Sequence, residues 1–152
     1  MTTLYSRVPT SITADSSTDV LSGSSQQLPM IVNSKTFTDT LNSLPDTSKW
    51  IIDVETNGLN PYNMNQICGI GLVPLNYKGA EAYYFPFRHQ SEEPNLTQAE
   101  LNELVAFIND KCDTIIGYNV KFDSKFLDNE GINIDKMKLV DVLVMVRMTE
   151  ST

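Results

Sequence analysis

The chain has few of the residue types on which many catalytic and cross-linked sites depend. Among 152 residues there is one histidine, His89, and there are two cysteines, Cys68 and Cys112. A single histidine excludes a multi-histidine metal centre and restricts any serine or cysteine triad to that one side chain. Two distant cysteines without a Cys-x-x-Cys pair favour reduced thiols, which we expect in the core. Any chemistry must therefore rest mostly on carboxylates.

Long apolar runs and basic residues are also scarce. The apolar stretch 139–146 is interrupted by Asp141 and is far shorter than the roughly 18 residues of a membrane span. Residues 1–20 lack a basic start followed by an apolar block, so the sequence predicts no secretory signal, no membrane partner and a cytoplasmic location. The 19 Asp plus Glu outnumber the 11 Lys plus Arg, and the net charge is −8. A polyanionic partner would therefore require metal ions or another protein surface to supply positive charge.

The pattern of apolar residues predicts one α/β domain preceded by a tail. Residues 1–27 are rich in Ser and Thr without apolar periodicity, which is typical of a flexible segment. Thr97 followed by Glu100 has the spacing of a helix capping box, and Ser34 is a candidate cap for an earlier helix. Strands and helices then alternate around a mixed sheet. The expected strands are 28–32, 50–54, 66–73, 80–87 and 113–118, and the expected helices are 34–44, 97–108, 119–129 and 142–148.

Two acids stand two residues apart on an otherwise apolar strand. Asp53 and Glu55 should project from the same face of the sheet, because side chains alternate along a strand. Two adjacent anions repel each other unless a cation lies between them, and Mg²⁺ or Mn²⁺ prefers carboxylate oxygens. The alternative is that both acids simply end the strand before the Asn57-Gly58 turn and face water.

A third acid lies where an apolar strand passes into a helix. The segment 117–123 reads Gly-Tyr-Asn-Val-Lys-Phe-Asp, and Asp123 falls in the first helical turn, where the helix dipole favours an anion. Alone, this acid is explained by that local role. The joint pattern is more specific: Asp-x-Glu followed by Thr-x-Gly-Leu, then Asn-x-x-Phe-Asp at a helix start.

With these motifs the chain resembles the DEDD superfamily of 3′–5′ exonucleases, most closely the proofreading domain of family A DNA polymerases. The segment 52–59 is similar to the first motif of that family and 117–123 to the second, while 140–147 is similar to the segment that follows. The resemblance extends over about residues 28–148. It implies a ribonuclease-H-like mixed sheet with flanking helices.

The resemblance implies a role for each matching residue. Asp53, Glu55 and Asp123 would be the catalytic acids and the ligands of a two-metal Mg²⁺ or Mn²⁺ site. The activity implied is release of nucleoside 5′-monophosphates from the 3′ end of single-stranded DNA, beside a polymerase domain in the same or a partner chain. The residues implied to contact the terminal nucleotide are Thr56, Leu59, Asn119 and Phe122.

The third motif of the family, Tyr-x-x-x-Asp or His-x-x-x-x-Asp on a later helix, does not occur within the 152 residues. We therefore expect residues 28–152 to be a partial exonuclease domain, incomplete at its C-terminal side, and a fragment of a DNA polymerase. Two alternatives stay open. One is an RNA exonuclease similar to ribonuclease D, and the other is a non-catalytic nucleic-acid-binding or interaction module with the same fold.

Residues 83–87 contain a dense aromatic cluster, and Arg88 and His89 follow it. The aromatic side chains could stack on bases, but a strand in the core explains most of them. Arg88 and His89 are expected in an exposed loop rather than on a substrate phosphate.

Overall fold

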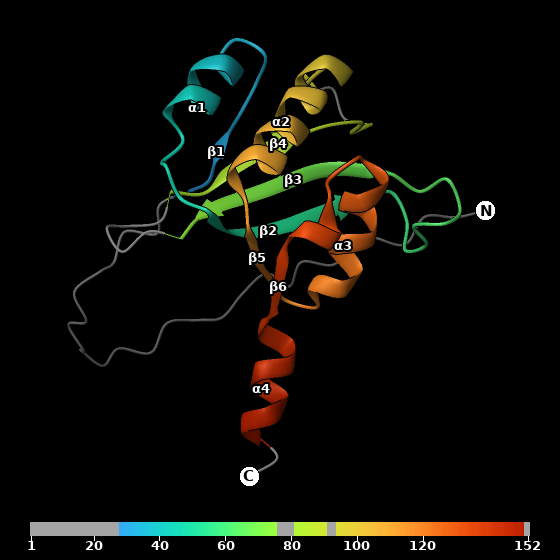
Figure 1. The fold of residues 1–152 in the computed structure, drawn as a ribbon. Coiled ribbons are helices and arrows are strands. Elements are labelled where there is room, and N and C mark those ends of the chain that lie inside the picture. Colours follow the sequence, from blue (N-terminus) through green and yellow to red (C-terminus); the bar gives the residue numbers. More distant parts are fainter. Residues whose placement is uncertain (1–27, 76–80, 91–93, 151–152) are drawn as a thin grey trace, which may run out of the picture.

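The computed structural model describes residues 28–75, 81–90 and 94–150, and Figure 1 shows their arrangement. The predicted tail 1–27 lies outside the described residues. The elements are β1 (Met30–Ile31), α1 (Phe37–Ser43), β2 (Lys49–Thr56), β3 (Ile67–Pro74), β4 (Tyr83–Pro86), α2 (Gln98–Lys111), β5 (Thr114–Gly117), α3 (Val120–Asn129), a 3₁₀ turn (Ile134–Lys136), β6 (Lys138–Asp141) and α4 (Val142–Glu150).

The six strands form one mixed sheet in the order β1-β4-β3-β2-β5-β6. The strands β2, β3 and β4 form an antiparallel meander. In contrast, β2, β5 and β6 run parallel, and β1 is parallel to β4. Parallel neighbours require a crossover connection: β3, β4 and α2 lie between β2 and β5, and α3 lies between β5 and β6. The predicted α/β fold with a mixed sheet is confirmed.

The sequence predicts the N-cap of α2 correctly and the N-cap of α1 incorrectly. Thr97 and Glu100 form the predicted capping box, each side chain accepting from the backbone of the other. The predicted Ser34 cap is wrong, because the N-cap of α1 is Thr36. Asn33 Oδ1 accepts from the N–H groups of Lys35 and Thr36, which turns the chain before the helix begins. The Ser34 hydroxyl donates instead to Glu100 Oε2 over 3.0 Å.

The core lies between the sheet and the helices that cover one of its faces. Figure 1 shows α1 and α2 together on the same side of the sheet. The side chains of Trp50, Ile52 and Val54 alternate along β2 and are buried. Of the two cysteines, Cys112 is buried as predicted, whereas Cys68 is only half-buried. The largest fully buried side chains are those of Phe37, Trp50, Ile52, Ile67, Ile70, Leu72, Phe85, Phe87, Leu101, Leu104, Ile108 and Phe126.

The opposite face of β2 is exposed and carries Ile51, Asp53 and Glu55. The last helix, α4, projects away from the sheet (Figure 1), and several of its apolar side chains are exposed, among them Val144, Met145 and Met148. In the part of the chain that the structure describes, no helix is both long and apolar enough to cross a membrane.

Candidate active site

The first two acids lie on the exposed face of β2, as the sequence predicts. Asp53 is paired with Gly71 and Glu55 with Gly69 on the antiparallel neighbour β3. Directly paired residues share a face of the sheet, so two glycines lie beside the two acids. Partial burial raises the pKa of Asp53, and the negative charge of Glu55 raises it further. The two carboxylates therefore repel each other in this arrangement.

Asp123 reaches the same end of β2 from helix α3. The carboxyl ends of the parallel strands β2 and β5 lie at one edge of the sheet, and α3 begins three residues after β5 ends. Asp123 lies in the first turn of α3, is only 4% exposed, and its Oδ1 accepts from the backbone N–H of Val54 over 3.0 Å. Val54 stands between Asp53 and Glu55. The fold thus brings the second motif against the backbone of the first.

Burial raises the pKa of Asp123 to about 6. The hydrogen bond from Val54 opposes this shift, while the charges of Asp53 and Asp141 add to it. Burial and neighbouring anions shift a carboxyl toward its protonated form. At pH 7, which lies above this pKa, Asp123 is still mostly ionised, so the site holds negative charge that destabilises the fold and would be stabilised by a cation.

This shift predicts how stability depends on pH. Because the pKa of Asp123 is higher in the folded chain than in the unfolded chain, the folded chain binds more protons between about pH 4 and pH 6. The free energy of unfolding should therefore fall as the pH rises through this window. Asp123→Asn removes the charge and keeps an oxygen that accepts from Val54. We expect Asp123→Asn to equal the parent near pH 4 and to exceed it by roughly 1–3 kcal/mol at pH 7 in urea titrations. Equal stability at both pH values would contradict the prediction.

Asp141 is a functional candidate that sequence reasoning did not single out. It ends β6 and precedes α4, and its Oδ1 accepts from the N–H of Leu143 over 2.9 Å and from the N–H of Asn119 over 3.0 Å. The first bond is an N-cap of α4, which the pattern of an acid before an apolar helix could have indicated. The second holds Asn119 in its left-handed conformation, with φ at 57°. Asp141 therefore fixes the turn that leads into α3 and Asp123.

The four residues expected to contact a nucleotide occupy different environments. Leu59 is 83% exposed beyond the end of β2. Asn119 is exposed and makes no side-chain cap bond to α3. Phe122 packs on Phe126, with ring centroids 5.1 Å apart. The Thr56 hydroxyl donates to the carbonyl of Gly58 over 2.7 Å and so stabilises its own turn. Their roles toward a substrate stay predictions.

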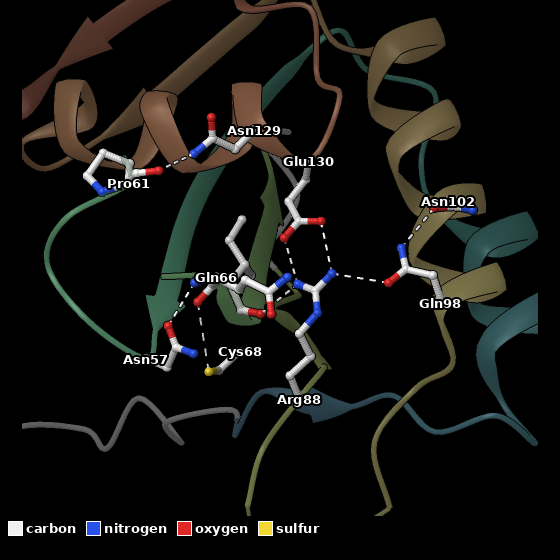
Figure 2. A network of polar contacts seen from close by, with 10 residues as sticks. Asn57, Pro61, Gln66, Cys68, Arg88, Gln98, Asn102, Asn129 and Glu130 are labelled. Carbon is white, nitrogen blue, oxygen red and sulfur yellow. Dashed lines mark hydrogen bonds and ion pairs between the residues drawn. The ribbon is translucent and has the colours of Figure 1, made fainter. Parts of the chain in front are cut away.

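Arg88 and His89 lie in a loop after β4, as expected, but they are half-buried rather than exposed. Figure 2 shows the guanidinium of Arg88 paired with the carboxylate of Glu130, the C-cap residue of α3; the N–O distances are 2.6 and 3.1 Å. Arg88 also donates to the carbonyl of Ile67 and to Gln98 Oε1 at the start of α2. A planar guanidinium can serve several acceptors at once, so Arg88 ties the segment after β4 to β3, α2 and α3.

The donor chemistry of the site fits a hard divalent cation. Asp53, Glu55 and Asp123 offer only carboxylate oxygens, and the repulsion that raises the pKa of Asp53 and Asp123 would be relieved by positive charge. The residues therefore fit the ion in charge and in ligand type. Across residues 28–75, 81–90 and 94–150, however, no three His, Cys, Asp or Glu side chains are gathered closely enough to form a metal site, so the three acids do not surround one point in this conformation.

Comparison with known proteins agrees with this geometry. No protein-family model matches the chain. DNA polymerase I of Borreliella burgdorferi is 32% identical over 98 residues, which are 62% of this chain and 10% of that protein. The chain therefore spans about a tenth of the length of this relative. Among solved structures, the Nibbler EXO domain of Aedes aegypti superposes with a TM-score of 0.51 at 14% identity, covering 80% of this chain and 56% of that one.

The structural match, at 14% identity, shows the fold alone, a ribonuclease-H-like α/β fold with a mixed sheet. The similarity to DNA polymerase I covers 62% of this chain and agrees with the resemblance of its first two motifs to those of DEDD-type exonuclease domains.

Proposed function

We propose that the chain removes nucleotides from the 3′ end of single-stranded DNA, as the proofreading part of a polymerase in the same or a partner chain, in the cytoplasm. The observation that carries the proposal is the contact between the two motifs, in which Asp123 accepts from the N–H of Val54 between Asp53 and Glu55. The sequence similarity to DNA polymerase I supports DNA as the substrate and a polymerase as the partner.

The reaction is hydrolysis of the terminal phosphodiester. A water oxygen forms a bond to phosphorus, the bond from phosphorus to the 3′ oxygen of the preceding nucleotide breaks, and that oxygen takes a proton. The products are a nucleoside 5′-monophosphate and a strand one nucleotide shorter. Two divalent ions, when bound, would activate the water and stabilise the leaving oxygen.

The side chains of this protein would bind the metal ions and orient the terminal nucleotide. Asp53, Glu55 and Asp123 would hold the metal ions, and burial of Asp123 fixes its carboxylate against β2. Exposed Leu59 and Asn119 would contact the terminal nucleotide, and Phe122, backed by Phe126, would pack against its base or sugar. With a net charge of −8, the chain should bind DNA weakly by itself and with strong dependence on divalent ions.

The test uses a 5′-labelled single strand, as DNA and as RNA of the same sequence, with Mg²⁺ or Mn²⁺ and with a chelator. We expect a ladder that shortens from the 3′ end, that requires the metal, and that forms faster on DNA. Asp53→Asn should remove the ladder, which also excludes a contaminating nuclease. Faster digestion of RNA would instead favour the ribonuclease-D-like alternative.

Calorimetric titration with Mn²⁺ separates an enzyme from a non-catalytic module. The parent chain should bind Mn²⁺, and Asp53→Asn should bind it more weakly. A chain that neither binds Mn²⁺ nor shortens either strand would overturn the proposed function.

A further inference from the structure

On the exposed face of the sheet, polar contacts connect three side chains in series, beginning with Glu55. The hydroxyl of Tyr84, on β4, donates to Glu55 Oε2 over 3.2 Å. The same hydroxyl lies 2.8 Å from Nε2 of His89, the only histidine of the sequence. A carboxylate accepts hydrogen bonds through two oxygens, so Oε2 can accept from Tyr84 while the other oxygen serves a ligand.

A glycine of β3, Gly69, makes this contact possible. Strand β3 separates β4 from β2, and Tyr84 is paired with Gly71, which is paired in turn with Asp53. Tyr84 therefore shares a face with the acids and passes diagonally over Gly69 to reach Glu55. A Cβ at position 69 would overlap the Tyr84 ring and hydroxyl. Any larger residue there would displace the tyrosine.

The backbone of His89 is held by the side chain of Asn95. Its N–H donates to Asn95 Oδ1 over 2.8 Å, and Asn95 Nδ2 donates back to its carbonyl over 2.9 Å. The neighbouring Arg88, with φ at 51°, is fixed by the carboxylate of Glu130. The arrangement in which Tyr84 gives its one hydroxyl proton to Glu55 requires His89 to donate to the tyrosine oxygen through Nε2–H.

We propose that Tyr84 is a positioning residue for Glu55, and that His89 orients the Tyr84 hydroxyl. This inference rests on the proposed function, in which Glu55 is a metal ligand. Groups that hydrogen-bond to metal ligands fix their orientation, and their loss typically lowers metal affinity or activity about 10–100-fold. A tyrosine hydroxyl, with an ordinary pKa of about 10, keeps at neutral pH the proton that it donates.

The strand offers a matched control for Tyr84→Phe. The neighbouring Tyr83 also donates to a glutamate, Glu81, but its ring is buried on the other face of the sheet. Tyr84→Phe should weaken Mn²⁺ binding about 10–100-fold and lower kcat similarly, with KM within about twofold, because only ligand orientation changes. Tyr83→Phe should match the parent in Mn²⁺ affinity. If Tyr84→Phe and the parent have equal Mn²⁺ affinity and equal kcat, this inference is overturned while the proposed function stands.

Two glycine variants test the path over β3. Gly69→Ala should reproduce the loss seen in Tyr84→Phe, because the added carbon overlaps the phenol. Gly71→Ala leaves 3.6 Å to the Asp53 carbonyl, so it should bind Mn²⁺ more tightly than Gly69→Ala. If circular dichroism shows that Gly69→Ala is unfolded, the Mn²⁺ affinity and kcat of Tyr84→Phe alone test the proposed role of Tyr84.

A measurement on the metal-free chain is independent of activity. The ¹⁵N spectrum of neutral His89 should show the proton on Nε2 in the parent and in Tyr83→Phe, and this preference should weaken in Tyr84→Phe. A proton on Nδ1 in the parent would overturn the role of His89. A parent chain that binds no Mn²⁺ would overturn the inference together with the proposed function.

Discussion

Asp123→Asn should reduce 3′–5′ cleavage at least about a thousandfold while the chain stays folded. A bound metal ion contributes several kcal/mol to the transition state, and each 1.36 kcal/mol is tenfold in rate. Asparagine is nearly isosteric and can still accept from the N–H of Val54, so the link between β2 and α3 survives. Only the negative charge beside Asp53 is lost. The measurement is single-turnover digestion of a 5′-labelled strand at saturating Mn²⁺.

The control is Asp128→Asn, which makes the same change at an exposed position of the same helix. It should cleave at the rate of the parent. A loss of cleavage in both variants would indicate damage to α3 rather than to the site. Full cleavage by Asp123→Asn would show that the buried carboxylate takes no part in the reaction, and the assignment of the second motif would then be wrong.

Trp50→Ala should cost about 3–5 kcal/mol of folding free energy. The Trp50 side chain is 1% exposed, its Nε1 donates to the Thr47 carbonyl over 2.9 Å, and its ring meets Phe107 edge to face at 5.7 Å. Truncation therefore leaves a large cavity between β2 and α2. Because domains of this size are stable by about 5–15 kcal/mol, much of the margin would be lost.

Urea unfolding followed by far-ultraviolet circular dichroism measures this effect, since Trp50 is the only tryptophan and fluorescence is lost with it. Trp50→Phe keeps an aromatic ring in the core and should cost less than Trp50→Ala. Tyr62→Ala removes a side chain that is 79% exposed and should change stability little. A cost below about 1 kcal/mol for Trp50→Ala would contradict the packing described.

The order of strands and helices was predictable because each element has a local signal. The period of two along β2 placed Asp53 and Glu55 on one face, and the capping box at Thr97 marked the start of α2. The failure at Ser34 has an equally local cause. Asn33 competes for the free N–H groups before α1, and a side chain two or three residues away decides which residue becomes the cap.

The contacts that complete the site were less predictable. Asp141 was visible only as an acid within an apolar segment, and its bond to Asn119 depends on the pairing of β5 with β6. Arg88 and His89 were expected in an exposed loop, because nothing local indicates Glu130 or Tyr84 as their partners. The contacts of Asp141 and Arg88 join residues 22 and 42 positions apart, and their energies depend on geometry rather than on composition.

The sequence by itself determined that this protein is an acidic α/β domain with carboxylates, rather than histidines or cysteines, at its candidate site. Short-range sterics and hydrogen bonds encode such features within a few residues. Only the tertiary structure decided that Asp123 contacts Val54 and that Tyr84 crosses over Gly69 to Glu55. These contacts follow from strand order and register, which the burial of a whole core selects and no local pattern specifies.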